Sequence, residues 1–301
     1  MDGIKTTSAA VNRGKRKKSG ARAFEARGPV GKVVNFLLLC VIGVFMALPL
    51  VLVVGNAFKP LDELFVWPPR LFPQHPTLDN FRNISALMSD SWIPMSKYIF
   101  NTVFVTLAST VLHVLAASMA AYVLEKRDFP LKRFLFRLVV ISLMFSSAVT
   151  QIPSYLIMAG LHWVDTYWSL VIPPIASAIG LYLMKQFMCN LPNALLESAR
   201  IDGASELRIF WQIVMPLVRP AWLTLIIFSF QTTWGTTGGS YIFSENLKTL
   251  SYALNQILKG GLARAGAGSA VSLIMIVPPV LVFIFTQRNI LQTMANSGMK
   301  D

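Results

Sequence analysis

One segment between two long apolar runs carries acidic and basic side chains together with a glycine. Residues 197–220 read ESARIDGASELRIFWQIVMPLVRP and contain three acids, three arginines and one glycine. Side chains of both signs can form ion pairs with a partner protein, whereas a helix that rests on anionic lipid is typically rich in Lys and Arg alone. The segment therefore predicts a docking surface for another protein.

The sequence contains no motif for nucleotide binding, metal binding or nucleophilic catalysis. The phosphate-binding pattern G-x-x-x-x-G-K-S/T is absent, so the chain is not expected to hold ATP itself. His75, His113 and His162 are scattered and form no pair with the spacing of metal ligands. His113 falls in the middle of an apolar run, where a packing role is favoured over a proton path. We expect a non-catalytic protein that binds no cofactor, and a membrane enzyme is the least favoured class.

The composition predicts an integral membrane protein. Of the 301 residues, 54% are hydrophobic and 14% are charged, whereas soluble domains carry about 25% charge. A transmembrane helix needs roughly 20 apolar residues. Six windows of that length lack Asp, Glu, Lys and Arg, and they predict an all-α membrane protein with six transmembrane helices: Val33–Phe58, Tyr98–Leu124, Leu138–Val164, Thr166–Met184, Pro220–Ser244 and Ala265–Gln287.

Asp165 alone separates the third window from the fourth. The stretch GLHWVDTYW at residues 160–168 therefore predicts a tight hairpin between two spans. None of the six windows has a charged residue at its centre, which disfavours a transporter that carries an ion on a buried carboxylate. The energy for any transport would then come from a partner.

The distribution of positive charge predicts that both termini lie in the cytoplasm. The segments on the side of the termini carry 20 of the 27 Lys and Arg residues. Residues 1–32 form a basic tail that we expect to be disordered, and its run RGKRKKSGAR suits anionic lipid better than nucleic acid. Residues 33–290 form the six-span domain, with a cytoplasmic loop at 185–219, and residues 291–301 form a cytoplasmic C-terminal tail.

The loop at 185–219 predicts two short helices joined by a glycine turn. The sequence NALLESARI at 193–201 favours helix, and Gly203 can supply the positive φ that ends it. Pro216 and Pro220 should end the second helix at the membrane. An amphipathic loop lying on lipid is the alternative to protein docking. Helical spacing in the second helix predicts one apolar face made of Leu207, Phe210, Trp211 and Val214.

This loop resembles the EAA loop of ABC-importer permeases, which reads E-A-A-x-x-D-G-A with I-x-L-P downstream. Ser198 stands where that family usually has Ala, and Met215 stands for the usual Leu. The positions that match the motif are Glu197, Ala199, Asp202, Gly203, Ala204, Phe210, Ile213, Pro216, Leu217 and Pro220.

Two further stretches resemble carbohydrate permeases of the maltose type. WPPRLFPQHPTLDNF at 67–81 is similar to their proline-rich segment after the first span, and AAYVLEKRDF at 120–129 is similar to their A-A-Y-x-L element. The resemblance covers essentially everything after the basic tail and is closest to the second, six-span permease. Trp234 is followed by Gly235 rather than the frequent Asn, and the chain ends in NSGMKD rather than in a sequence like G-A-V-K-G, which leaves the sugar open.

The resemblance implies the fold of a type I ABC importer permease and a transport subunit without catalytic residues. Its expected partners are a sibling permease in a heterodimer, two cytoplasmic ATPase subunits that hold ATP and Mg, and an extracytoplasmic solute-binding protein. The expected location is the inner membrane of a prokaryote, with the lipid bilayer as surroundings and no nucleic acid as partner.

The resemblance also implies roles for individual residues. The loop would be the coupling helix, with Glu197 pairing with a basic residue in a cleft of the ATPase. The predicted coupling residues are Glu197, Ser198, Ala199, Asp202, Gly203, Ala204, Phe210, Ile213 and Pro216. Four polar or aromatic span residues are candidates to line the pathway, although hydrogen bonding or packing between helices is favoured for each: Asn101, Gln151, Gln231 and Trp234.

Two alternatives to a sugar importer stay open. An ABC permease could carry a polyamine, phosphate or a peptide, and a ligand screen on its binding protein would separate these cargoes. An ion-coupled secondary transporter would take up its substrate in the absence of any ATPase.

The topology can be tested with single cysteines in a chain whose Cys40 and Cys189 are replaced by serine. In intact cells, His75→Cys should react with an impermeant maleimide, because that loop is expected to lie outside. Ser205→Cys should react only after lysis. The opposite labelling pattern would overturn the predicted topology.

Overall fold

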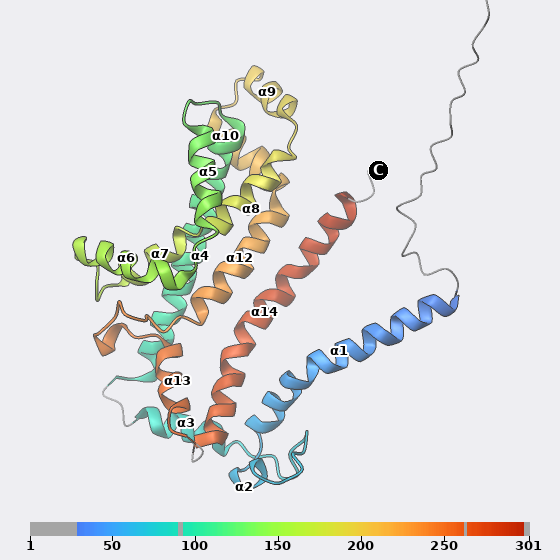
Figure 1. The fold of residues 1–301 in the computed structure, drawn as a ribbon, viewed down its shortest axis with the longest axis vertical. Coiled ribbons are helices and arrows are strands. Elements are labelled where there is room, and N and C mark those ends of the chain that lie inside the picture. Colours follow the sequence, from blue (N-terminus) through green and yellow to red (C-terminus); the bar gives the residue numbers. More distant parts are fainter. Residues whose placement is uncertain (1–28, 90–92, 262–263, 298–301) are drawn as a thin grey trace, which may run out of the picture. The chain divides into compact units, whose positions relative to one another are not determined.

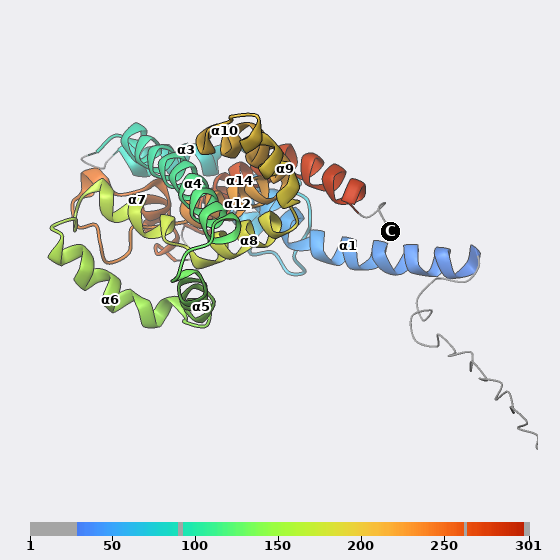
Figure 2. The same ribbon diagram turned by 90° about the horizontal axis from the view of Figure 1, so that it is seen from above.

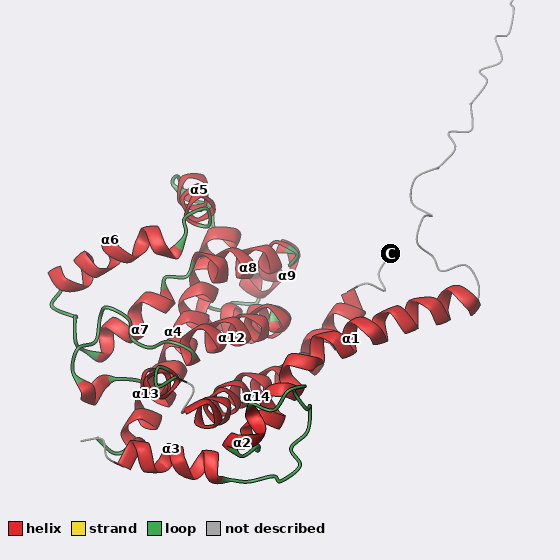
Figure 3. Cartoon of the chain, turned by 60° about the horizontal axis from the view of Figure 1, so that its bottom comes forward, coloured by secondary structure: helices red, strands yellow, loops and turns green. Residues whose placement is uncertain are grey.

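The computed structural model describes residues 29–89, 93–261 and 264–297, and the regular elements in these ranges are all helices (Figure 3). The chain divides into two compact units, residues 1–51 and residues 52–301, which are described separately. The described part of the first unit belongs to α1 (Pro29–Ala57), whose apolar side chains from Val33 to Met46 are exposed. Such a helix is suited to lipid, where every backbone N–H and C=O must find its partner within the chain.

The second unit is built around the long helix α4 (Met95–Lys126), which packs against α7, α8, α12 and α13 (Figure 1). Ala117 and Ala121 on α4 are buried in a core that also contains Met184 and Met188 of α8 and Leu225 of α12. Small side chains at this spacing let helix backbones approach closely in a membrane. The remaining elements of this unit are α2 (Leu61–Leu64), α3 (Asp79–Ser89), α5 (Lys132–Ser142), α6 (Ser147–Gly160), α7 (Tyr167–Ile175), α8 (Ala178–Cys189), α9 (Asn193–Ile201), α10 (Glu206–Ile209), η1 (Phe210–Val214), α11 (Met215–Leu217), α12 (Arg219–Trp234), η2 (Glu245–Leu247), α13 (Leu250–Leu258) and α14 (Ala265–Ser297).

The helices that could cross a membrane correspond to most of the charge-free windows. Within the described residues a fifth candidate exists if Glu206–Leu217 and Arg219–Trp234, which are bent by 80°, count as one span. Four helices in the described residues are long and apolar enough to cross a membrane: Gly31–Ala57, Met95–Lys126, Tyr167–Cys189 and Ala265–Gln287.

The third charge-free window forms two helices instead of one long helix. It falls on α5 and α6, and α6 turns across the direction of α5 (Figure 1). Ser146 starts α6, and its side-chain oxygen accepts a hydrogen bond from the Ala148 N–H at 3.4 Å. A serine at this position offers the backbone a cap that competes with continued helix, a signal that charge counting cannot detect.

A turn joins α6 to α7 at the place of the predicted hairpin, and its Asp165 also holds a distant loop. Asp165 has φ +60°, which an L-residue adopts in tight turns, and its N–H donates to the Tyr241 carbonyl at 2.8 Å. Its carboxylate accepts hydrogen bonds from the N–H groups of Phe243 at 2.9 Å and Ser244 at 2.8 Å, and from the Ser244 hydroxyl. The hydrogen bond from the Ser244 side chain is the largest cause that lowers the pKa of Asp165.

We expect Asp165→Asn to lower the thermal unfolding temperature of the detergent-solubilised protein by a few degrees. Hydrogen bonds to a charged acceptor contribute about 1.5–3 kcal/mol, and partial exposure of Asp165 reduces that to about 1 kcal/mol. A carboxyl whose pKa is lowered by folding stabilises in full above its unfolded pKa of about 3.9, and this stabilisation is lost as the pH falls through the folded pKa. The difference between wild type and variant should therefore be constant from about pH 7 to pH 5 and shrink below about pH 4.

The matched control is Asp62→Asn, which removes an exposed carboxylate of α2. Equal unfolding temperatures for the Asp165 and Asp62 variants would show that Asp165 does not hold the loop.

Candidate functional site

The segment at 193–217 forms the helix α9, a glycine turn and a second helix that begins with α10. In Figure 1 it lies at the upper end of the second unit. Gly203 has φ +80°, and open space surrounds the position where a Cβ would be. The Gly203 N–H donates to the Arg200 carbonyl at 3.0 Å, and the Ala204 N–H donates to the Ala199 carbonyl at 3.0 Å. This pair of bonds is the Schellman arrangement that ends a helix with a left-handed residue. It reverses the chain within three residues.

The second helix begins at Ser205 and contains a π turn. The Ser205 side-chain oxygen accepts a hydrogen bond from the Arg208 N–H at 3.4 Å, as an N-cap does. Residues 210–214 then form the π turn η1, in which hydrogen bonds join residues five apart. Phe210 and Val214 are buried, but Leu207 and Trp211 are exposed, so only half of the predicted apolar face points into the core. Leu207 precedes the π turn, and Ile209 is buried in its place, so the π turn can change the register only of the residues after position 209.

The nine predicted coupling residues separate into a surface group and an anchoring group. Phe210 and Ala199 are buried, and Ala204 and Ile213 are half-buried against the core of α4 and α8. The exposed members are Glu197, Ser198, Asp202, Gly203 and Pro216. Two apolar side chains flank the glycine turn at the surface, Ile201 at 86% exposure and Leu207 at 66%. We call the exposed residues around the glycine turn, from Glu197 to Arg208, the tip of the segment. The tip has an apolar centre with charged neighbours.

Glu206 joins three elements and is the electrostatic centre of the segment. One carboxylate oxygen accepts from Arg200 Nε at 2.9 Å and lies 2.5 Å from Arg127 Nη2, and the other accepts from the Tyr122 hydroxyl at 2.7 Å. These partners come from α9, the end of α4 and the residue after α4. The hydrogen bond to Glu206 is the largest cause that raises the pKa of Arg200. Tyr122 and Arg127 lie in the stretch AAYVLEKRDF that resembles carbohydrate permeases, but their contact with Glu206 could not be predicted, because they are 84 and 79 residues away from it in the chain.

Further contacts tie the same end of α4 to α8 and α9. Lys126 donates to the Leu191 carbonyl at 2.6 Å and to Asn193 Oδ1 at 2.9 Å. Lys185 of α8 forms an ion pair with Glu125 at 2.7 Å, and both side chains are largely buried. An ion pair with little access to water is held more firmly than one on an open surface. The segment 193–209 is therefore attached to α4 and α8 and is not a free loop.

A sharp elbow connects the segment to α12. The stretch Glu206–Leu217 meets Arg219–Trp234 at 80°, with Val218 between them. The indole N–H of Trp222 donates to the Met215 carbonyl at 3.0 Å across the elbow. Pro216 and Pro220 lie on either side of the bend, as the sequence predicted, because proline removes a helical hydrogen bond.

Two of the four candidate pathway residues are occupied with hydrogen bonds inside the chain. Asn101 is buried, donates to the carbonyls of Asn246 at 2.8 Å and Lys248 at 2.9 Å, and accepts from the Tyr167 hydroxyl at 2.8 Å. The Trp234 indole N–H donates to the Met275 carbonyl at 3.1 Å and links α12 to α14. These contacts fit the structural role that was favoured for each.

The other two pathway candidates are exposed. Gln151 on α6 lies 3.4 Å from the Ser240 hydroxyl, and Gln231 projects from α12. They come from different elements, and no described contact joins them. A shared site of the four residues is therefore not formed within this chain's described part.

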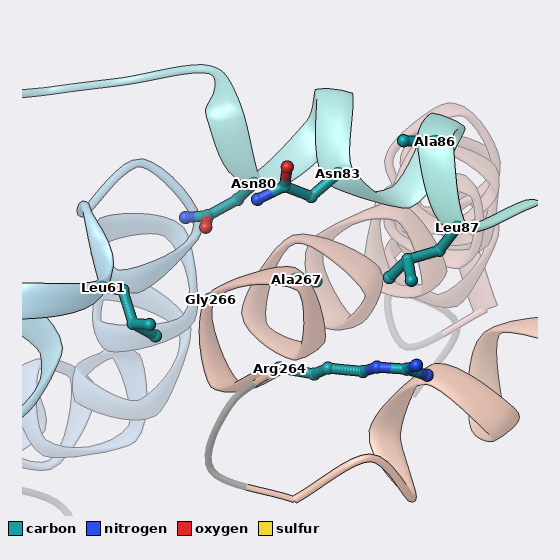
Figure 4. Close-up of a pocket in the computed structure, with 8 residues that line it drawn as sticks. All are labelled: Leu61, Asn80, Asn83, Ala86, Leu87, Arg264, Gly266 and Ala267. Atoms are coloured by element: carbon teal, nitrogen blue, oxygen red, sulfur yellow. The ribbon is translucent and has the colours of Figure 1, made fainter.

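A polar pocket lies at the opposite end of the unit, between α3 and the start of α14 (Figure 4). Its volume is about 330 Å³, and the side chains of Asn80, Asn83 and Arg264 give it polar walls. Asn80 is already bonded to the carbonyls of Ala57 at 3.0 Å and Lys59 at 2.7 Å. Among the described residues no group of three or more His, Cys, Asp or Glu could hold a metal ion.

Comparison with known proteins gives a consistent set of relatives. The family described as binding-protein-dependent transport system inner membrane component matches residues 113–296. The polygalacturonan/rhamnogalacturonan transport system permease protein YtcP of Bacillus subtilis is 32% identical over 276 residues, covering 86% of this chain and 92% of that protein. The arabinooligosaccharides transport system permease protein AraQ of Halalkalibacterium halodurans is 31% identical over 271 residues, covering 89% and 95%.

A solved structure shows the same fold. It is the crystal structure of a bacterial ABC transporter involved in the import of the acidic polysaccharide alginate, and one of its chains matches with a TM-score of 0.73. The match covers 88% of this chain and 99% of that chain at 20% identity. A likeness at this identity concerns the fold alone.

We expect Glu206→Gln to loosen the segment 193–204. The substitution removes the charge that Arg200 and Arg127 face, so backbone amides of α9 should exchange with deuterium about three- to tenfold faster. Hydrogen exchange measured by mass spectrometry on the detergent-solubilised protein checks this. Asp202→Asn, at an exposed position of the same turn, is the control. Unchanged hydrogen exchange in the Glu206 variant would show that the contacts of Glu206 do not hold α9 in place.

Proposed function

We infer that this chain, which belongs to the family of binding-protein-dependent transport system inner membrane components, is a permease subunit that carries a sugar or oligosaccharide through the membrane in an ATP-driven importer. The single observation that carries the mechanism is the helix, glycine turn and helix at 193–209. This unit is exposed at its tip and bonded at its base to α4.

The exposed tip is the proposed docking surface for cytoplasmic ATPase subunits. Ile201 and Leu207 offer an apolar centre, and Glu197, Asp202 and Arg208 surround it with charge of both signs. A small apolar centre within a polar rim is the usual composition of a protein interface. Lipid is a weaker candidate, because the acids of the tip would be repelled by anionic headgroups. ATP and Mg would be bound by those partners, since this sequence has no phosphate-binding loop.

The contacts at the base explain how a push on the tip would reach the membrane helices. Glu206 connects the tip to Tyr122 of α4, and Lys126 connects α4 to the start of α9. The buried Phe210 packs against the Tyr122 ring, with 5.5 Å between ring centroids. Closure of the ATPase dimer would thus displace α4 and α8, and the elbow at Val218 would pass the movement to α12.

We propose six spans with both termini in the cytoplasm. The third span would consist of the two helices α5 and α6 with the break between them. Many of their apolar side chains are exposed on the surface of the unit. Irregular backbone at membrane depth is tolerated where protein covers it. A sibling permease in a heterodimer is the proposed cover, and the two subunits together would enclose the pathway.

The proposed cargo is a saccharide delivered by an extracytoplasmic binding protein. Two relatives are named as transport system permease proteins for polygalacturonan/rhamnogalacturonan and for arabinooligosaccharides, and both align over most of this chain. The pocket between α3 and α14 lies at the end of the unit opposite the docking tip, where a binding protein would approach (Figure 1). A non-saccharide cargo is tested by a ligand screen on that binding protein. A secondary transporter is tested by uptake without ATPase subunits.

Glu197→Lys and Gly203→Pro should each reduce uptake at least about tenfold and weaken recovery of the ATPase in a detergent pull-down. The first reverses a charge at the docking tip. The second removes the residue whose φ of +80° forms the turn, because proline is confined to φ near −65°. Both variants should still insert into the membrane.

The control is Asp128→Lys, a charge reversal at a fully exposed side chain on the same side of the membrane, for which we expect normal uptake. Normal uptake by both tip variants would contradict the docking assignment. Equal loss in the Asp128 variant would show that the effect is not specific to the tip.

A further inference from the structure

The arginines of α9, α10 and α12 differ in their contacts. Arg200 of α9 is held by Glu206, and Arg208 Nε of α10 donates to Gln212 Oε1 at 2.9 Å. Arg219, at the start of α12, is exposed, and its guanidinium makes no hydrogen bond or ion pair with another residue in the described part of the chain. Its charge therefore has no role in holding the tip or the elbow.

Arg219 lies on the wall of an apolar groove of about 530 Å³. The groove runs between α4 and the elbow that joins η1 and α11 to α12, and α4 and α12 pack side by side (Figures 1 and 2). Its described lining is apolar or aromatic apart from Arg219 and Thr110, whose hydroxyl is buried. Val111 is 56% exposed and Trp211 is 50% exposed, so the groove opens at the surface of the unit.

The charge and the apolar walls lie at different depths along the helices. Ile226 follows Arg219 by seven residues, so it lies on the same face of α12, about 10 Å further along the helix axis. Val111, Val114 and Leu115 have helical spacing and form the facing wall on α4. The described lining contains no Asp or Glu. The groove therefore has a positive charge at one end and apolar side chains beyond it.

Two tryptophans mark the charged end of the groove. The Trp222 ring is fixed across the elbow by the hydrogen bond from its indole N–H to the Met215 carbonyl, and both residues line the groove. The exposed Trp211 packs edge-on against Phe210, with 5.1 Å between ring centroids. Tryptophan and arginine are typical of the depth at which lipid headgroups lie. The charged end of the groove is therefore expected at headgroup depth, and its apolar end in the hydrocarbon.

The chemistry of the groove favours a lipid over a helix of this chain. The segment α1 is apolar enough to cover it, but α1 contains no Asp or Glu and would leave Arg219 without a partner. A phospholipid supplies both parts, because its phosphate can form two hydrogen bonds with one guanidinium and its acyl chain suits the apolar walls. Basic pockets between membrane helices on the cytoplasmic side are known to bind anionic headgroups.

We propose that this groove binds one anionic phospholipid, whose phosphate pairs with Arg219 and whose acyl chain lies against the walls on α4 and α12. Met215 and Trp222 come from the two arms of the elbow, so the bound lipid contacts both arms and stabilises their bend of 80°. The identity of the transported cargo does not enter this inference.

The test uses the full-length chain, with the subunits that co-purify with it, in mixed detergent and lipid micelles. The probes are phosphatidylglycerol with a photoreactive diazirine in one acyl chain, and the matching phosphatidylcholine. Adducts are mapped by mass spectrometry as the lipid fraction is varied. Phosphatidylglycerol should label residues of the groove. Arg219→Gln should raise its half-saturating fraction about fivefold and leave that of phosphatidylcholine within about twofold, since one cationic contact is lost.

A second variant and two controls test the place of binding. Val111→Trp fills the groove from α4 and should abolish labelling by both lipids. Arg133→Gln removes an exposed arginine of α5, and Val123→Trp enlarges an exposed side chain of α4. Neither residue lines the groove, so both controls should label as wild type does.

Thermal unfolding separates a lipid contact from a structural role of Arg219. In micelles without phospholipid, Arg219→Gln should unfold at the wild-type temperature, because no described contact is lost. Added phosphatidylglycerol should raise the unfolding temperature of wild type more than that of the variant, since a ligand stabilises in proportion to its affinity for the folded state.

Four results would overturn the lipid site. They are equal half-saturation in wild type and Arg219→Gln, unchanged labelling in Val111→Trp, a lower unfolding temperature of Arg219→Gln without lipid, and absence of adducts in the groove. The last would mean that protein covers the groove, as a helix of another subunit or α1 would. Uptake is not measured, so each of these results leaves the proposed transport function intact.

Discussion

The constraint on which this structure depends is the need to satisfy every backbone N–H and C=O that enters lipid. Helices do this within one segment, which is why long charge-free runs become α1, α4 and α14. The same constraint confines charge to short connecting segments. The residues that can act on a partner are therefore concentrated at the ends of the helices, and the segment 193–209 combines charge of both signs with a glycine turn.

Glu206 attaches that segment firmly to α4 and to the residue after it. Its carboxylate brings together a hydroxyl from α4, a guanidinium from α9 and a second guanidinium just after α4. Opposite charges at a partly exposed site contribute modestly to stability, but three partners on one carboxylate fix an orientation. The tip can then transmit force to α4, and the elbow at Val218 extends the connection to α12. Docking and transport are coupled through these contacts in the proposed mechanism.

A cavity beside His113 lies among the same helices, between α4, α8 and α12. Unpartnered buried polar atoms occur in both places among the described residues, at Arg200 Nη2 in the segment 193–209 and at the Ser229 hydroxyl beside this cavity. One face of α4 and α12 thus serves packing, through Ala117, Ala121 and Leu225, and another faces a polar cavity.

The sequence alone determined the class of protein, the positions of most spans, and the helix, turn and helix around Gly203, because apolar runs, proline and glycine act through neighbouring residues. It misjudged the face of the second short helix, since a π turn at 210–214 is not visible in the spacing of apolar residues. The break between α5 and α6 was hidden, because Ser146 lies in a run without charge. Only the tertiary structure decided that Tyr122 and Arg127 meet Glu206 and that Asn101 hydrogen-bonds to segments far away in the chain. These are pairings between distant segments, and no local preference of the chain specifies them.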